Sequence, residues 1–272
     1  MSLRIEKWEG LGNDFIVLDA REAGSLPEWI VDTQAETERQ SHFRAWCDRH
    51  RGVGADGVLL VKSADSGLAQ MFVYNADGSR PEMCGNGLRC VAAFLVSHGA
   101  PTEFEVETEA GLKRCHVERD GEATFNVRVS MGPARDQGLR ELSLLGATVR
   151  LRDINIGNPH AILFEPFPEV NRDELAVLLE HSRDGLTNVE FATVRSSTKI
   201  ELVVWERGVG YTQACGTGAC ATVFAAALEG RLEYEQAIAV ELPGGLLSIR
   251  CSRDGAVQMF GPARRTFVAQ LG

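Results

Sequence analysis

The chain has 272 residues, 44% of them hydrophobic, which is enough for one large core or for two domains of roughly 130 residues. Its formal net charge of −10 excludes a polyanionic partner such as nucleic acid or an anionic membrane surface. Residues 1–15 lack the apolar stretch of a signal peptide, and the longest nearly apolar run, Ala219 to Leu228, is too short to span a bilayer. We therefore expect a soluble, cytoplasmic protein.

The cysteines indicate free thiols rather than a disulfide framework or a metal site. Their number is odd, no secretory segment precedes them, and no CxxC pair occurs. The spacings of Cys84 from Cys90 and of Cys215 from Cys220 do not suit zinc ligands. We therefore predict no bound metal. The seven cysteines are Cys47, Cys84, Cys90, Cys115, Cys215, Cys220 and Cys251.

In chain order, the first half of the sequence consists mainly of predicted strands. Phe43 to Asp48 predicts a helix on the outside, and Leu88 to Ser97 predicts a second helix. The long polar stretch from Ser25 to His42 carries no pattern that assigns it a structure. Gly52 to Gly57 spells GxGxxG, but a strand follows it, which excludes dinucleotide binding. Runs rich in β-branched or aromatic residues predict four strands: Phe15 to Asp19, Val58 to Val61, Met71 to Tyr74 and Phe104 to Glu107.

The second half contains two more predicted helices. Asp173 to His181 predicts a helix on the outside, whereas Ala219 to Leu228 is apolar on almost every face and predicts a buried helix. Asp-Gly pairs at Asp120-Gly121 and Asp254-Gly255 predict hairpin turns. The residues after Pro262 predict one short C-terminal strand, which we expect to pack on the first half because chain ends are often held in this way.

The two halves repeat one another. Cys84-Gly85-Asn86-Gly87 and Cys215-Gly216-Thr217-Gly218 lie 131 residues apart, and each precedes a predicted helix. Composition bias does not explain further matches that recur in the same order at similar offsets. These matches are Gly12-Asn13 with Gly157-Asn158, Ala110-Gly111-Leu112 with Gly244-Gly245-Leu246, Arg119-Asp120-Gly121 with Arg253-Asp254-Gly255, and Met131-Gly132-Pro133-Ala134 with Phe260-Gly261-Pro262-Ala263.

The repeat predicts two domains that arose by internal duplication. The first comprises residues 1–132 and is completed by a C-terminal strand at 264–272, and the second comprises residues 133–263. The expected fold class is α+β, with two pseudo-symmetric domains. Each is a mixed, mainly antiparallel sheet or barrel wrapped around a central helix, and the active site lies in the interdomain cleft.

Each CGxG motif places a cysteine just before a helix. The first N–H groups of a helix have no intrahelical partner and carry partial positive charge, so they can bind a carboxylate. The same position lowers the pKa of a thiol, into a range of roughly 3.5 to 7.5. We therefore expect thiolates to be available at Cys84 and Cys215 near neutral pH.

Two such motifs facing each other across a cleft would bind one carboxylate and place one sulfur on each face of the carbon that bears it. One thiolate can then remove the α-proton while the opposite thiol delivers another. The helix ends stabilise the charge that develops on the carboxylate. This geometry predicts amino-acid epimerisation without a nicotinamide, flavin or pyridoxal cofactor.

Two other interpretations compete with this one. Cys84 and Cys215 can be ordinary buried thiols beside glycine caps, since free cysteine is among the most buried residue types. The appearance of the motif at matched positions in both halves argues against that interpretation. A redox dithiol needs a CxxC partner, which both cysteines lack.

Seven short motifs are spread along the chain: Gly10 to Phe15 (GLGNDF), Gly52 to Gly57 (GVGADG), Asn75 to Ser79 (NADGS), Met83 to Gly87 (MCGNG), Gly157 to His160 (GNPH), Glu206 to Gly208 (ERG) and Ala214 to Cys220 (ACGTGAC). Together they closely resemble the diaminopimelate epimerase family. The resemblance implies an isomerase that interconverts LL- and meso-diaminopimelate in lysine and peptidoglycan-precursor biosynthesis, with a small amino acid as its substrate and no cofactor.

The resemblance also implies a set of site residues. Cys84 and Cys215 would be the two acid/base residues, and His160 and Glu206 would sit beside the thiols and tune their protonation. The reacting carboxylate would be held by Gly85, Asn86, Gly216 and Thr217. The other charged groups of the substrate would be read by Asn13, Asn75, Asn158, Asn188 and Arg207, whose side chains supply donors, acceptors and a planar cation.

The sequence departs from the family pattern at a few positions. Gly57 stands where some members carry a glutamine that touches the substrate, and Tyr211 replaces a more usual Glu or Leu. Arg80-Pro81 stands where small or acidic residues are more common. Phe267 stands where some members carry a dimer-forming tyrosine, so a homodimer is expected.

Two rival functions follow from the same features. One is a racemase of another amino acid, such as histidine or hydroxyproline, on the same scaffold. The other is a non-catalytic protein that binds a ligand or senses a dithiol. Arg207 together with the four asparagines favours a long substrate with a second charged end.

Overall fold

The computed structural model describes residues 3–22, 24, 26–81 and 83–271. Ser25, the first residue of the polar stretch, and Gly272, the last residue of the predicted C-terminal strand, lie outside the described residues, as do Met1 and Ser2. The described residues form sixteen strands and few helices, so the predicted α+β fold class is confirmed.

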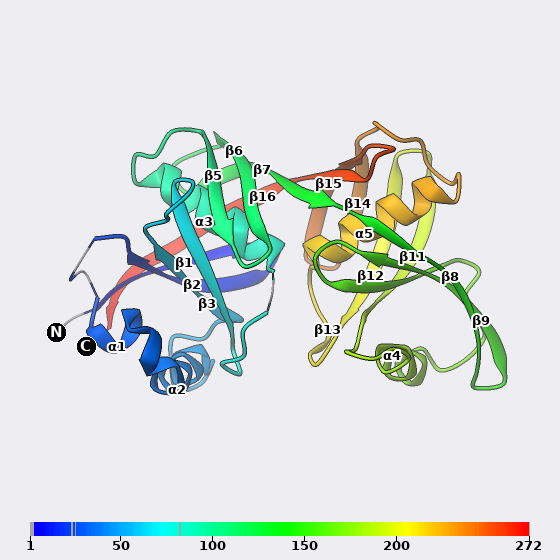
Figure 1. Cartoon of the computed structure of the whole chain (residues 1–272), viewed down its shortest axis with the longest axis horizontal. Coiled ribbons are helices and arrows are strands. Elements are labelled where there is room, and N and C mark those ends of the chain that lie inside the picture. The colour runs from blue at the N-terminus through cyan, green and yellow to red at the C-terminus, as the bar shows by residue number, and fades with distance from the viewer. Residues whose placement is uncertain (1–2, 23, 25, 82, 272) are drawn as a thin grey trace. The chain divides into compact units, whose positions relative to one another are not determined.

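The chain folds into two compact units. One comprises residues 1–129 and 261–272, and the other comprises residues 130–260. Each unit is built around one long helix that follows a cysteine, with strands surrounding that helix (Figure 1).

The sheet of the first unit closes on itself. The strand order is β1-β2-β3-β4-β5-β6-β7-β16, and β16 pairs antiparallel with β1, from Leu3 opposite Leu271 to Glu9 opposite Arg264. Closure leaves no exposed sheet edge between these strands. The eight strands are β1 (Leu3–Gly10), β2 (Asn13–Ala20), β3 (Gly57–Lys62), β4 (Ala69–Asn75), β5 (Glu103–Thr108), β6 (Gly111–Arg119), β7 (Thr124–Pro133) and β16 (Ala256–Leu271).

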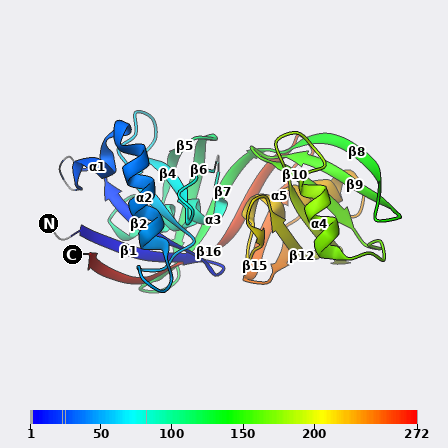
Figure 2. The ribbon, with the colours of Figure 1, turned by 90° about the horizontal axis from the view of Figure 1, so that it is seen from below.

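The residues after Pro262 are not a separate short strand. They are the second part of β16, which pairs with β15 (Gly245–Cys251) near its start and with β1 near its end (Figure 2). The prediction of a short strand was wrong because a Gly-Pro pair usually interrupts a strand, whereas here Gly261-Pro262 lies inside one.

Helix α3 (Gly85–Ser97) fills the first barrel. It contacts β1, β2, β3, β4 and β6, and residues 85–95 are all buried. The sequence predicts this helix from Leu88, but it begins three residues earlier, at Gly85, because Cys84 is the residue that caps it. The Trp8 ring packs against Phe94 and Phe125, with ring centroids 6.5 and 5.7 Å away.

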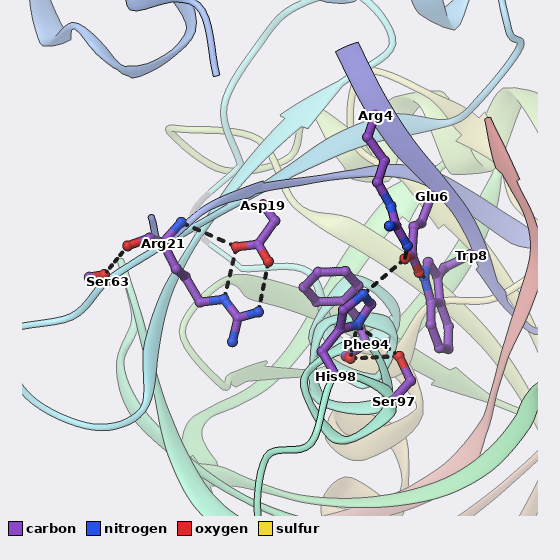
Figure 3. A network of polar contacts seen from close by, with 9 residues as sticks. All are labelled: Arg4, Glu6, Trp8, Asp19, Arg21, Ser63, Phe94, Ser97 and His98. Carbon is purple, nitrogen blue, oxygen red and sulfur yellow. Dashed lines mark hydrogen bonds and ion pairs between the residues drawn. The ribbon is translucent and has the colours of Figure 1, made fainter. Parts of the chain in front are cut away.

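A buried carboxylate holds the C-terminal end of α3 (Figure 3). Glu6 is 2% exposed and accepts hydrogen bonds from Trp8 Nε1 (3.0 Å) and Arg4 Nη2 (3.2 Å). Its Oε1 lies 3.1 Å from Nε2 of His98, the C-cap residue of α3, and His98 Nδ1 lies 2.9 Å from Phe94 O. These contacts tie the helix to β1 and so fix the position of the residues at its other end.

The polar stretch after β2 is helical and lies outside the barrel (Figure 2). It contains α1 (Glu28–Val31), the 3-10 turn η1 (Thr33–Ala35) and α2 (Glu36–Cys47). The helix predicted at Phe43 to Asp48 is therefore too short. Its first turns carry no apolar pattern because the inward side chain there is Arg39, which donates to Ile30 O and Tyr74 Oη (both 2.9 Å).

The second unit follows the same plan. Helix α5 (Gly216–Leu228) contacts β9, β10, β11, β12 and β15, and residues 216–227 are buried, as the apolar run predicts. Helix α4 (Arg172–Glu180) covers the outside and is capped by Asn171. The strand order is β15-β14-β12-β11-β10-β9-β8, with β13 paired to β12. The remaining strands are β8 (Arg135–Leu144), β9 (Ala147–Asn155), β10 (Pro159–Phe164), β11 (Asn188–Ser196), β12 (Lys199–Glu206), β13 (Gly210–Tyr211) and β14 (Ile238–Leu242).

Both predicted hairpin turns are present. Asp120-Gly121 joins β6 to β7, and Asp254-Gly255 joins β15 to β16. The four strands predicted in the first half fall within β2, β3, β4 and β5. Within the described part of the chain, no helix combines the length and the apolar character needed to cross a membrane.

Candidate active site

Cys84 is the N-cap residue of α3. Its backbone is extended (φ −134°, ψ 103°), and its carbonyl accepts the first helical hydrogen bond, from Leu88 N (2.9 Å). Its Sγ accepts a hydrogen bond from Gly87 N (3.3 Å), and the residue is half-buried. The sulfur takes the place that a hydroxyl or carboxylate usually occupies at an N-cap, so the helix itself orients the thiol.

Asn13 and Asn86, both predicted to bind the substrate, are bonded to each other. Asn86 lies in the first turn of α3, and its Nδ2 donates to Asn13 Oδ1 (3.2 Å). Asn13 Nδ2 donates to Asp56 Oδ2 (2.8 Å), and Arg89 Nη1 donates to Asn86 Oδ1 (3.0 Å). The chain of bonds brings together three of the seven motifs and holds both amides in fixed orientations.

Asn75 is held separately from this pair. It ends β4 opposite Gly57 of β3, and its Nδ2 donates to Ser79 Oγ (2.9 Å). A Cβ at Gly57 would lie 2.4 Å from the carbonyl oxygen of Tyr74, so this backbone leaves no room for a side chain at that position. The glutamine contact expected in some family members therefore cannot be restored here by substitution alone.

Cys215 caps α5 in the same way, but in a buried setting. Its backbone is again extended (φ −123°, ψ 106°), and its Sγ accepts from Gly218 N (3.4 Å). Thr217 Oγ1 lies 3.5 Å from the sulfur. The residue is 5% exposed and lies beside the carboxyl group of Glu206, whose Oε1 accepts from Thr212 Oγ1 (2.6 Å).

The expected low pKa is wrong for Cys215. Burial raises the pKa of its thiol well above the usual value, and the neighbouring carboxyl group of Glu206 adds to the effect. Hydrogen bonds from Thr217 and Gly218 lower this pKa but are outweighed. Burial also raises the pKa of Glu206. A helix N-terminus alone therefore does not lower the pKa of this buried thiol.

His160 reaches the second thiol through two other predicted residues. Its Nε2 lies 3.0 Å from Asn158 Oδ1, and Asn158 Nδ2 donates to Thr217 Oγ1 (3.3 Å). The second unit thus joins His160, Asn158, Thr217 and Cys215 in one chain of hydrogen bonds. On its other side, His160 Nδ1 lies 2.6 Å from Oε1 of Glu190, and both side chains are fully buried.

Arg207 lies in the turn that follows β12. The turn is held by Asn188, whose Oδ1 accepts from Arg207 N (3.0 Å) and whose Nδ2 donates to Pro159 O (3.2 Å). Glu180, the last residue of α4, holds it from the other side, since its two oxygens accept from Gly208 N (2.6 Å) and Trp205 Nε1 (2.8 Å). Both groups of the Asn188 side-chain amide are therefore hydrogen-bonded to backbone atoms, one of them the N–H of Arg207.

Two buried carboxyl groups of this site, Glu190 and Glu180, are absent from the set predicted by sequence. Glu190 carries a detectable signal, because it is a charged residue between the apolar Val189 and Phe191, two positions from Asn188 and so on the same face. Glu180 ends an amphipathic surface helix, where a glutamate is ordinary, and nothing in the sequence distinguishes it.

The sequence is similar to known proteins over nearly its whole length. A family model described as diaminopimelate epimerase matches residues 6–136 and 153–266. A diaminopimelate epimerase from Synechocystis sp. is 38% identical over 288 residues and covers 99% of each chain. Another, from Synechococcus elongatus, is 40% identical over 296 residues and covers 100% of this chain and 99% of its own. The chain belongs to the diaminopimelate epimerase family. It is therefore an isomerase of the epimerase type.

Solved structures with other names share the fold of this diaminopimelate epimerase family member. A hydroxyproline epimerase from Agrobacterium vitis aligns with a TM-score of 0.77 at 16% identity, covering 99% of this chain and 92% of that one. A PhzF-family phenazine biosynthesis protein from Bacillus anthracis aligns with a TM-score of 0.74 at 13% identity, covering 100% and 99%. At these identities the likeness shows the fold alone, so the substrate has to be inferred from side chains.

Proposed function

We propose that this epimerase interconverts LL- and meso-diaminopimelate, and that Cys84 and Cys215 move the α-proton without a cofactor. The observation that carries the proposal is the cysteine-capped buried helix found once in each unit, α3 and α5. Relatives named diaminopimelate epimerase that match over their full length support the choice of substrate. In this role the enzyme supplies lysine and peptidoglycan-precursor biosynthesis in the cytoplasm.

The reaction is an exchange of one proton for another at the α-carbon. A thiolate takes the α-proton, and the electron pair of the broken C–H bond moves onto the substrate carboxylate. The thiol on the opposite face then gives its proton to the carbon, and that electron pair forms the new C–H bond. The second sulfur is left as a thiolate, so charge is conserved and the roles are exchanged for the reverse reaction.

The surroundings of the two sulfurs suggest which role each one starts in. Because burial raises the pKa of Cys215, we assign this residue as the acid for the epimer whose α-hydrogen faces Cys84, which acts as the base. As Cys215 gives up its proton, Gly218 N–H and the hydroxyl of Thr217 can both donate to the sulfur. These preformed donors stabilise the charge that appears there.

The substrate is held by donors at the two helix starts and by the polar side chains around them. The first-turn N–H groups at Gly85-Asn86 and Gly216-Thr217 bind the reacting carboxylate and the charge that develops on it. The guanidinium of Arg207 binds the distal carboxylate through two parallel hydrogen bonds. The remaining polar groups of the substrate are read by Asn13, Asn75 and Asn158, while Asn188 acts by holding the turn of Arg207.

Replacing either cysteine tests this mechanism. A serine hydroxyl is a far weaker acid than a thiol, so Cys84→Ser and Cys215→Ser should each lower kcat with diaminopimelate by about 10²- to 10⁴-fold. Cys90→Ala is the matched control, because Cys90 is a fully buried thiol of α3 that faces the core and should leave kcat nearly unchanged. Full activity in either serine variant would rule out the two-thiol mechanism.

A substrate panel tests the second part of the proposal. The wild-type enzyme should incorporate solvent deuterium into the meso-diaminopimelate that it forms from the LL isomer, and should incorporate none into histidine, proline or hydroxyproline. Exchange into one of those amino acids, with none into diaminopimelate, would show that the scaffold serves a different racemase.

A further inference from the structure

We propose that Glu190 is a positioning residue for the second thiol: through His160, Asn158 and Thr217 it fixes a hydroxyl donor that points at the Cys215 sulfur. The inference rests on the proposed function, in which Cys215 transfers the α-proton. In this role Glu190 does not contact the substrate. It acts on the Cys215 sulfur through three intervening side chains, and all five residues belong to one unit.

Glu190 is a carboxyl group built into the core. It lies within β11 between Val189 and Phe191, and its relative exposure is 0%. Its Oε1 lies 2.6 Å from His160 Nδ1 and would lie 2.7 Å from a Cβ at Gly218, so it packs directly against the turn that caps α5. Its Oε2 is buried and has no hydrogen-bond partner among residues 3–22, 24, 26–81 and 83–271.

The unpartnered oxygen indicates that Glu190 is neutral. An ionised carboxylate with a bare buried oxygen pays a large desolvation cost, whereas a protonated carboxyl leaves only a carbonyl oxygen unsatisfied. Burial raises the pKa of Glu190, which agrees with the neutral form. The proton belongs on Oε1, because there it finds an acceptor, His160 Nδ1, and on Oε2 it finds none.

A proton on Oε1 sets the direction of every later hydrogen bond. His160 Nδ1 accepts it, so the ring carries its own proton on Nε2 and donates to Asn158 Oδ1 (3.0 Å). The Asn158 amide is then oriented with Nδ2 donating to Thr217 Oγ1 (3.3 Å). The hydroxyl proton of Thr217 is left to point at Cys215 Sγ (3.5 Å).

The surroundings of the sulfur agree with this direction. The Cys215 sulfur already accepts from Gly218 N (3.4 Å), so it acts as an acceptor in this turn and can accept a second hydrogen bond from Thr217. Without a donor at position 190, the His160 proton is free to move to Nδ1. That shift reverses the Asn158 amide and turns the Thr217 hydroxyl away from the sulfur.

Two substitutions of similar length test the chain. Glu190→Gln keeps an N–H that can donate to His160 Nδ1, whereas Glu190→Met keeps the length and removes the donor. The first measurement is the pH dependence of Cys215 alkylation by iodoacetamide, followed by mass spectrometry of the peptide that contains Cys215. It needs no epimerase activity. The second measurement is kcat and KM with diaminopimelate.

Glu190→Met should raise the pH of half-maximal Cys215 alkylation, because the thiolate loses its hydroxyl donor. It should lower kcat by about tenfold, the value of roughly one hydrogen bond, with KM changed by less than about threefold. Glu190→Gln should keep the wild-type alkylation profile and at least about a third of kcat. Thr217→Val removes the last link, should reproduce the alkylation shift of Glu190→Met, and should add nothing further when combined with it.

Several results would overturn the inference. An unchanged alkylation profile in Glu190→Met would show that Glu190 does not position the thiol. A Glu190→Gln profile shifted to lower pH would show that Glu190 is an anion, and this variant decides the point even if Glu190→Met fails to fold. A wild-type enzyme inactive on diaminopimelate, with the alkylation shifts intact, would contradict the proposed function and leave the role of Glu190 standing.

Discussion

Cys84 and Cys215 accept the same hydrogen bond from the third residue of their helices, at 3.3 and 3.4 Å, but they differ in what else surrounds them. Cys84 is half-buried, whereas Cys215 is 5% exposed and lies beside the carboxyl groups of Glu206 and Glu190. A duplicated motif has thus been placed in two electrostatic environments. In our mechanism this difference assigns the first proton donor.

The sequence alone identifies both sulfurs, because the same motif stands before a predicted helix in each half. It does not predict the raised pKa of Cys215. Its main cause is burial, and the strands that enclose the thiol, β11 and β12 among them, approach it only in the folded chain. A helix end lowers the pKa of a thiol only locally, and at Cys215 burial outweighs that effect.

Asp14 provides a pH-dependent stability test in the first unit. Burial opposes its ionisation, but hydrogen bonds from Arg49 and Lys7 lower its pKa to about 2. Because the folded pKa lies below the unfolded value of 3.8, the ionised group stabilises the fold above about pH 4, and this contribution is lost as the pH falls towards 2.

Asp14→Asn should therefore lower the free energy of unfolding at pH 7 by about 1 kcal/mol, a value reduced for solvent screening because Arg49 is exposed. Urea unfolding of both proteins between pH 7 and pH 2 is the measurement. The difference should shrink steadily below pH 4. A difference that stays constant over this range would show that the charge of Asp14 does not stabilise the fold.

At the scale of elements, the turn between β12 and β13 is held from both sides. Glu180 accepts from Gly208 N and Trp205 Nε1, and Tyr211 Oη donates to Asp173 Oδ1 (2.9 Å), so both ends of α4 contact this hairpin. Tyr211, which departs from the family pattern, therefore contributes a contact that fixes the turn carrying Arg207.

Glu180→Gln tests whether this support matters for binding. A glutamine has one acceptor oxygen in place of two, so one of the two hydrogen bonds to the turn is lost and Arg207 is held less firmly. We expect KM for diaminopimelate to rise about three- to tenfold, the effect of one hydrogen bond, with kcat changed less.

Glu174→Gln is the control for this prediction, because Glu174 is an exposed glutamate on the same helix. If kcat falls in Glu180→Gln while KM stays constant, Glu180 does not act through the binding of the distal carboxylate.

Elements with a strong local signal could be predicted, and those without one could not. The run from Ala219 to Leu228 is apolar all round, and the two Asp-Gly pairs specify tight turns, so α5 and both hairpins follow from sequence. The full length of helix α2 could not be predicted, because its inward face includes a charged residue, Arg39. The charge of Arg39 is satisfied by Glu36 and by backbone carbonyls of the preceding turns.

At the scale of the whole molecule, the α+β class follows from the repeated order of strands, turns and helix in the two halves. The path of the C-terminal segment does not follow from sequence. β16 runs for 16 residues through Gly261-Pro262, pairs with β15 and β1, and so completes a barrel with the last residues of the chain. The pairing of β16 with β1 joins the two ends of the described chain, from Leu3 to Leu271, and no local sequence pattern predicts it.

The most direct test of the two-thiol mechanism is to measure deuterium incorporation during the reaction in heavy water. Purified enzyme is mixed with LL-diaminopimelate and no added cofactor, and the deuterium content of substrate and product is followed by mass spectrometry from the first few per cent of reaction. The account predicts meso-diaminopimelate with one deuterium at the inverted carbon, while the remaining LL substrate stays unlabelled. Meso product that retains the original hydrogen would mean that a single group carries the proton across, and would contradict the account.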